Sequence, residues 1–134
     1  MQRIDGTLIF SPSDLQKFVD CEHLTRLQVR VSDGELTAPS RDDEELELLR
    51  RKGMDHERSW LERLRSEGKS IVEIPERNDW TAAAEATEAA MRLGVDVIYQ
   101  AVFQDDSWRG IADFHVRVPQ LTGLGPLGYE ACSP

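Results

Sequence analysis

Apolar residues recur along much of this chain with the spacing of amphipathic helices. After a short apolar run at 7–10, Ser11 and Pro12 have the pattern of a helix start, with Asp14 as the reciprocal capping carboxylate. A stop at Asp33-Gly34 closes this first segment. Apolar spacing and end signals together predict three helices, at 11–31, 43–67 and 79–93.

Alternating or continuous apolar runs, bounded by Gly, Pro and Asp residues, predict strands in the second half of the chain. Four strands are expected, at 70–74, 97–104, 108–118 and 129–132. The second and third are joined by an Asp-Asp-Ser turn as a β-hairpin. This order predicts an α/β (α+β) fold in one domain, with a helical region at 11–67 and a sheet-forming region at 70–132.

Composition narrows the class of protein. With 134 residues, 40% hydrophobic and 31% charged, the chain has the make-up of a globular domain, and no stretch has the length of a membrane span. No secretory signal opens it, and two cysteines do not form a disulfide framework, so a cytoplasmic protein is expected. The net charge of −9 argues against a protein that simply coats nucleic acid. Metal-dependent nucleases remain compatible, because their sites need carboxylates.

His56 lies on the predicted second helix among apolar neighbours. At 100° per residue, five residues share one stripe of that helix: Leu46, Leu49, Gly53, Trp60 and Leu64. His56 falls between Leu49 and Trp60. His56 is therefore expected to point into the interior or a cleft, either as a core histidine with one hydrogen bond or as a ligand. A glycine inside a helix is unfavourable, so Gly53 suggests that something approaches the backbone closely.

Asp113 occupies the middle of an apolar strand, where aspartate is disfavoured. Strict alternation places it with Ile111, His115 and Arg117 on one face, and Ala112 with Phe114 on the other. That face could be solvated, and Asp113 could pair with Arg117. Combined with an inward His56, Asp113 makes a Mg²⁺ or Mn²⁺ site plausible.

Cys21 lies within the first predicted helix. From its neighbours alone, a small buried hydrophobic residue is the simplest interpretation. An iron–sulfur cluster needs about four cysteines, and this sequence has two.

Several of these segments together resemble the RecB-like branch of the PD-(D/E)XK nuclease superfamily, in a group related to the CRISPR-associated adaptation exonucleases. The matching stretches, in the family's order, are 11–15 with Cys21-Glu22-His23, 51–57, 96–101, 108–114 and Tyr129-Glu130. The resemblance implies a restriction-endonuclease-like mixed central sheet flanked by helices. It also implies that His56 and Asp113 bind a catalytic Mg²⁺ or Mn²⁺, that Glu130 belongs to the catalytic set, and that DNA, as single strands or duplex ends, is the substrate.

The sequence departs from the family after Glu130. Relatives continue with Asp-x-Lys on the same strand, which supplies a second carboxylate and a lysine that orients water, whereas here Ser133 stands about where that Asp belongs and Pro134 follows it. Full-length relatives also carry three later cysteines that hold a [4Fe–4S] cluster together with the one matching Cys21. The resemblance therefore implies an N-terminal part of the nuclease, incomplete at its C-terminus and inactive by itself.

Two other interpretations follow from the same residues. The chain could be a non-catalytic remnant that serves as a binding or interaction module, which suits its acidic charge. It could also be a nuclease completed by another polypeptide that supplies the missing C-terminal part. No membrane partner is expected.

Overall fold

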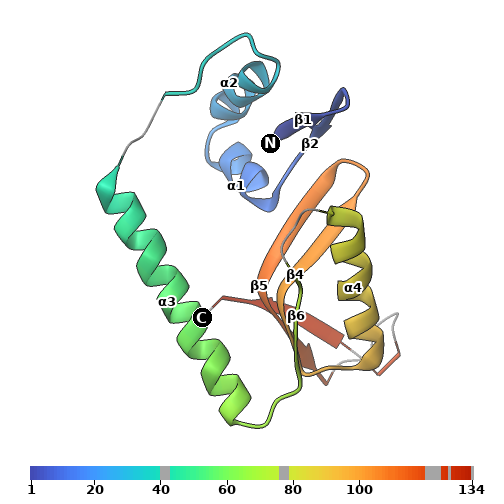
Figure 1. Ribbon diagram of the computed structural model, residues 1–134. Helices are drawn as coiled ribbons and strands as arrows, with labels where there is room; N and C mark the ends of the chain where they lie inside the picture. The colour runs from blue at the N-terminus through green and yellow to red at the C-terminus, as the bar shows by residue number, and fades with distance from the viewer. Residues whose placement is uncertain (40–42, 76–78, 120–124, 127, 134) are drawn as a thin grey trace. The chain divides into compact units, whose positions relative to one another are not determined.

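The computed structural model describes residues 1–39, 43–75, 79–119, 125–126 and 128–133. Within these ranges the fold is α+β, with four helices, a mixed four-stranded sheet and a small hairpin (Figure 1). The chain forms two compact units, one of residues 1–42 with 103–110, the other of 43–102 with 111–134. The expectation of a single domain stays a prediction. Every helix in the described ranges is too short or too polar to cross a bilayer.

The first unit contains a hairpin and two short helices. Strands β1 (Gln2–Ile4) and β2 (Thr7–Ile9) pair antiparallel, and helices α1 (Pro12–Asp20) and α2 (Glu22–Ser32) follow. The predicted cap is confirmed, because Asp14 Oδ2 accepts a hydrogen bond of 2.8 Å from the Ser11 backbone N–H.

The single helix predicted at 11–31 is wrong, because the helix is broken at Cys21. The Cys21 backbone is extended, with φ −161° and ψ 100°, and this residue is the N-cap of α2. Its N–H donates to the Lys17 carbonyl, and its own carbonyl accepts from Leu24 N–H. Neither glycine nor proline marks the break, which lets α1 and α2 contact one another as two separate short helices.

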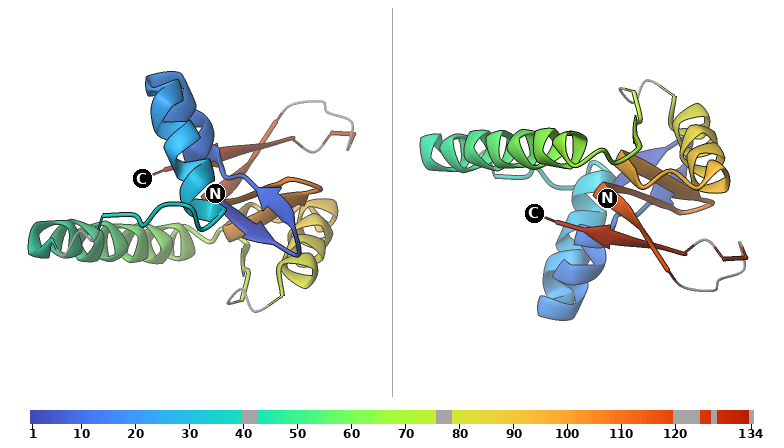
Figure 2. Two further views of the ribbon diagram at one scale, coloured as in Figure 1. Left: turned by 90° about the horizontal axis from the view of Figure 1, so that it is seen from above. Right: turned by 90° about the horizontal axis from the view of Figure 1, so that it is seen from below.

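The second unit is built on the sheet β3-β4-β5-β6. Its strands are β3 (Ile71–Glu73), β4 (Val97–Asp105), β5 (Trp108–Val118) and β6 (Gly128–Cys132), and its helices are α3 (Glu44–Ser66) and α4 (Trp80–Leu93). Strand β3 is parallel to β4, and β5 is antiparallel to β6. Figures 1 and 2 show α3 as one continuous helix. These elements confirm the predicted ones to within a residue or two.

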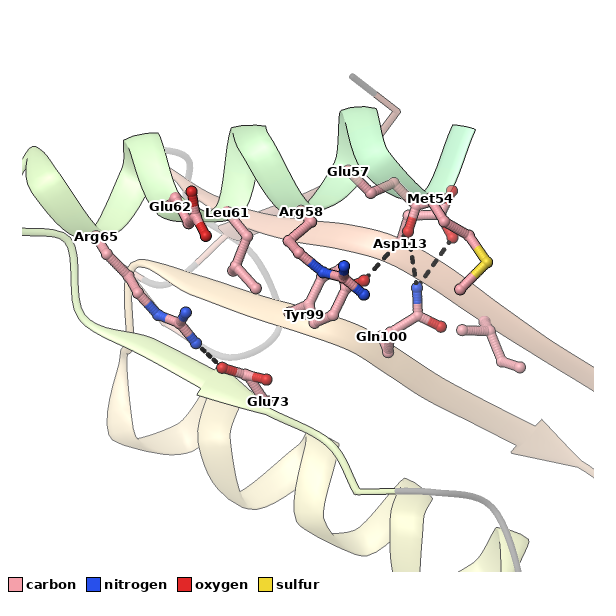
Figure 3. Close-up of a pocket in the computed structure, with 11 residues that line it drawn as sticks. Met54, Glu57, Arg58, Leu61, Glu62, Arg65, Glu73, Tyr99, Gln100 and Asp113 are labelled. Carbon is pink, nitrogen blue, oxygen red and sulfur yellow. Dashed lines mark hydrogen bonds and ion pairs between the residues drawn. The ribbon is translucent and has the colours of Figure 1, made fainter. Parts of the chain in front are cut away.

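Two apolar clusters hold the sheet and its helices together. One joins α4 to the sheet and contains Ile74, Ala83, Ala90, Ile98, Ala101 and Val102. The other joins α3 to the sheet and contains Leu61, Leu64, Val97 and Phe114. Trp60 packs edge-on against Phe114, with ring centroids 4.5 Å apart. The last turns of α3 are thus anchored on the sheet face that does not carry α4 (Figure 3).

His115 gives the second unit a pH-dependent stability. It is 8% exposed and its ring stacks on Tyr129, with centroids 5.2 Å apart. Burial lowers the pKa of His115 below its ordinary value. Because the unfolded chain then binds a proton more readily than the folded one, stability is full above about pH 6.5 and decreases as pH falls below it.

We predict that the free energy of unfolding falls between pH 7.5 and 5, by at most about 1.4 kcal/mol per pH unit from this group. Urea unfolding at several pH values measures it. His115→Phe should flatten the profile, whereas His23→Gln, at an exposed position of α2, should leave it unchanged. A His115→Phe profile as steep as the wild type would contradict this assignment.

Candidate functional site

A cavity of about 750 Å³ lies beneath the middle and last turns of α3, over β4 and β5 (Figure 3). All of its lining residues belong to the second unit: Met54, Glu57, Arg58, Leu61, Glu62, Arg65, Glu73, Tyr99, Gln100, Ile111 and Asp113. This volume is within the usual range of small-ligand sites. Four carboxylates and two guanidinium groups make the lining strongly polar.

Two carboxylates from different elements meet at one amide in this cavity. Gln100 Nε2 donates to Glu57 Oε2 of α3 at 3.4 Å and to Asp113 Oδ1 of β5 at 3.3 Å. Figure 3 shows both carboxylates directed at the Gln100 side chain. Both are half-buried, so their mutual repulsion is only partly screened by water. The amide N–H groups offset that repulsion.

Tyr99 adds a second donor to the same carboxylate. Its hydroxyl donates to Glu57 Oε2 at 3.2 Å. Burial, and then the neighbouring charge of Glu57, raise the pKa of Tyr99 above its ordinary value. The phenol therefore remains protonated and keeps donating at neutral pH.

The backbone at Gln100 breaks the alternation of β4. Its φ is +56°, in the left-handed region that residues other than glycine rarely occupy. Tyr99 and Gln100 are consecutive, yet both reach Glu57 on the α3 side of the sheet. Such a local irregularity re-aims a side chain in the manner of a β-bulge.

Strand β5 is irregular at the same level, which corrects the predicted strict alternation. Ala112 packs against the α4 cluster, whereas Phe114 is buried in the α3 cluster, so the two do not share a face. Asp113 lines the cavity beneath the same helix that Phe114 contacts. Alternation from Ala112 places Asp113 on the α3 side, and the irregularity lets Phe114 lie on that side as well.

Asp113 is neither in bulk solvent nor paired with Arg117. The Arg117 guanidinium contacts Asp96 at 3.1 Å and donates to the Gly94 carbonyl at 2.9 Å. Hydrogen bonds from Ser70, and then the charge of Arg117, hold the pKa of Asp96 below its ordinary value. Arg117 therefore ties β5 to the start of β4, and the carboxylate of Asp113 faces the cavity.

The expectation that His56 points inward is wrong in this structure. His56 is exposed, and the cavity is lined instead by the next residue, Glu57. The helix packs through Leu61 and Leu64, which centres its buried stripe close to Glu57 and well away from His56. The structure thus brings Glu57, and not His56, together with Asp113. The role of His56 as a metal ligand stays a prediction.

The close approach expected at Gly53 is also wrong. This residue is exposed, and a Cβ atom built on it would meet nothing within 4 Å. Gly110, by contrast, does face a close neighbour, because a Cβ there would lie 3.2 Å from Pro12 Cγ. That contact belongs to the first unit and not to the cavity.

Glu130 lies on β6, exposed, and does not line the cavity. It pairs with Val116 in a register that also sets Phe114 opposite Cys132. Continuing this register by one residue sets Ser133 opposite Asp113. Ser133, the residue for which the resemblance predicts a carboxylate, would then lie next to Asp113 across the strand pair.

The two cysteines are free thiols in different settings. Cys21 is exposed at the N-cap of α2, so its interpretation as a buried residue is wrong; the helix break places it at the surface. Cys132 is half-buried at the end of β6. Among the described residues, no group of three or more His, Cys, Asp or Glu side chains is arranged to hold a metal ion.

Of the residues that line the cavity, Asp113 alone was identified from the sequence as a candidate site residue, and the three that hydrogen-bond around it were not: Glu57, Tyr99 and Gln100. Glu57 precedes Leu61 by four residues and Leu64 by seven, so the three share one face of the helix. A charged residue on an apolar helix face is a usable signal of a site. Gln100 has a polar amide side chain inside an apolar strand, which is a weaker signal of a site. Nothing in the sequence announces its positive φ.

Comparisons with models of protein families, with curated proteins and with solved structures found no match for this chain. The candidate site therefore rests on its own geometry.

Gly53 offers a direct test of how α3 is surrounded. Gly53→Ala should raise the free energy of unfolding by about 1 kcal/mol, because alanine favours helix and its methyl group meets nothing here. Thermal unfolding measures the change. Gly94→Ala is the matched control and should be destabilising, because Gly94 caps α4 with φ 72°. A lower melting temperature for Gly53→Ala would show that something contacts the backbone there.

Proposed function

We propose that this chain carries part of a RecB-like, Mg²⁺- or Mn²⁺-dependent DNA nuclease centre, with a restriction-endonuclease-like sheet beneath it. The observation that carries the proposal is the convergence of Glu57 and Asp113 on one amide in a polar cavity. Phosphodiester hydrolysis is the reaction, and a nucleic-acid strand is the substrate.

The donor set fits the proposed cation. Mg²⁺ and Mn²⁺ prefer oxygen ligands, and Mg²⁺ is held in many enzymes by one or two carboxylates, with water and substrate phosphate completing its shell. Glu57 and Asp113 supply two such carboxylates. When bound, the cation polarises the phosphoryl oxygen and lowers the pKa of the attacking water. The family resemblance implies His56 as the ligand from the helix, whereas the geometry favours its neighbour Glu57.

The register of β5 and β6 supports the resemblance independently of the helix. Ser133 comes opposite Asp113 when the pairing is continued by one residue, as expected for a pair of metal-binding strands. The sequence 1–134 has a serine there, and its last lysine is Lys69. With two carboxylates and no lysine following Asp113, we expect weak cation binding and little cleavage by this sequence alone.

Arg58 is the residue we assign to the substrate phosphate. It is exposed and lines the cavity one position after Glu57, and Figure 3 shows its side chain extending from α3 toward β4. The other cavity arginine, Arg65, pairs with Glu73. A guanidinium group matches the geometry of phosphate oxygens well.

The first test is the binding of Mn²⁺ by the folded chain, followed by isothermal titration calorimetry. Asp113→Asn and Glu57→Gln should each weaken binding by at least about tenfold, since even partners outside the ligand shell cost that much. His56→Ala should leave binding unchanged. Loss of Mn²⁺ binding in His56→Ala, with normal binding in Glu57→Gln, would show that His56 and not Glu57 is the ligand from the helix.

Restoring the second carboxylate tests the strand register. Ser133→Asp should strengthen Mn²⁺ binding, and adding one lysine after Pro134 as well would complete an Asp-x-Lys in the sequence and should raise cleavage of single-stranded DNA. Ala131→Asp, opposite His115, is the matched control and should not strengthen binding. If neither the wild-type chain nor Ser133→Asp binds Mn²⁺ measurably, the alternative interpretation, a non-catalytic binding module, would be favoured.

A third test concerns Arg58 and nucleic-acid affinity. Arg58→Ala should weaken binding of single-stranded DNA in Ca²⁺ and reduce the slope of log affinity against log salt by about 0.7, the value for one phosphate contact. Arg63→Ala is the control, because Arg63 is on the same helix, pairs with Glu67 and does not line the cavity. Equal salt slopes for the two variants, measured by fluorescence anisotropy, would remove Arg58 from the phosphate contact.

A further inference from the structure

Strand β4 departs from regular alternation at Gln100, whose φ is +56°. In a regular strand, consecutive side chains point to opposite faces. Tyr99 and Gln100 are consecutive, yet both reach Glu57 of α3. The irregular backbone therefore directs the Gln100 side chain toward α3.

The backbone conformation at this point is unfavourable for glutamine. Its φ of +56° is one of two positive values at non-glycine residues in the described chain, and the other, at Asp5, is in the turn between β1 and β2. Glycine adopts this conformation without cost, and asparagine does so more readily than glutamine. If the irregular backbone were the only requirement at this position, glycine would be the more stable residue. Strain of this kind persists where the surroundings enforce it, often at functional sites.

The glutamine side chain supplies a reason for that cost. Its Nε2 lies within hydrogen-bond distance of both Glu57 and Asp113, whose like charges would otherwise repel one another. An amide has two N–H donors on one nitrogen and can serve two acceptors at once. A shorter or apolar side chain at the same position would leave the two carboxylates free to separate.

We propose that Gln100 is the positioning residue of this site: its strained backbone aims an amide that holds Glu57 and Asp113 together, ready for a divalent cation. This inference rests on the proposed function, because it takes the two carboxylates as the cation ligands. It adds that the spacing of the ligands is set by a third side chain before any cation binds.

Gln100→Gly separates the two consequences of this arrangement. Glycine relieves the backbone strain but also removes the amide that offsets the repulsion between Glu57 and Asp113, so the two effects oppose one another and the melting temperature without cation should stay close to that of the wild type. Removal of the amide should weaken Mn²⁺ binding by about tenfold or more, as for other residues that orient ligands. The rise in melting temperature on adding Mn²⁺ should shrink accordingly. Unchanged stability with reduced affinity is a combination that a merely structural residue does not produce.

The experiment combines thermal unfolding with calorimetric titration of Mn²⁺ for four proteins: wild type, Gln100→Gly, Asp113→Asn and Gln104→Gly. Gln104→Gly is the matched control on the same strand, exposed and outside the cavity, and should leave Mn²⁺ affinity unchanged. Wild-type affinity in Gln100→Gly, with loss in Asp113→Asn, overturns the positioning role and leaves the proposed function standing. A Gln100→Gly chain that no longer unfolds cooperatively without cation assigns Gln100 to the structure alone and also overturns it. Absence of Mn²⁺ binding by the wild type overturns the proposed function and this inference with it.

Discussion

The packing of Leu61 and Leu64 against Phe114 and Val97 is the contact on which the candidate site depends. It fixes the rotation of α3 about its own axis. Because a helix repeats every 3.6 residues, the side chain four positions before Leu61 must then face the same sheet surface, and that residue is Glu57. Any other rotation of the helix would withdraw Glu57 from Gln100. The charged site is thus positioned by apolar burial one turn away.

The sheet makes the complementary adjustment. In two neighbouring strands, alternation is interrupted at the level of the cavity, at Gln100 in β4 and near Asp113 in β5. In β4 the irregularity lets Tyr99 and Gln100 both face α3, and in β5 it lets Asp113 and Phe114 do so. Phe114 remains fully buried directly after Asp113. Irregular strands can therefore carry polar groups beside an intact core, at a cost in backbone strain.

The elements were predictable from the sequence because their ends carry local chemical signals. Asp79 accepts from Ala82 N–H at the start of α4, and Gly94 ends that helix in the left-handed conformation, as such residues do in many proteins. The site was predictable only in part. Asp113 was found because a carboxylate in an apolar strand is unusual. The apolar stripe does not predict the rotation of α3, because two of its members, Leu46 and Leu49, are 50% and 59% exposed.

Electrostatics links the acidic composition to the proposed chemistry. Glu57 and Asp113 repel one another across the cavity, and a nucleic-acid phosphate would add a third negative charge. Arg58 offsets only part of it, since Arg65 is engaged with Glu73. Under the proposed function, a phosphodiester would bind at this cavity only together with a divalent cation, whose charge would reverse the sign of the interaction. On this argument a net charge of −9 is compatible with a nucleic-acid substrate, because the attraction resides in the occupied site and not in the surface as a whole.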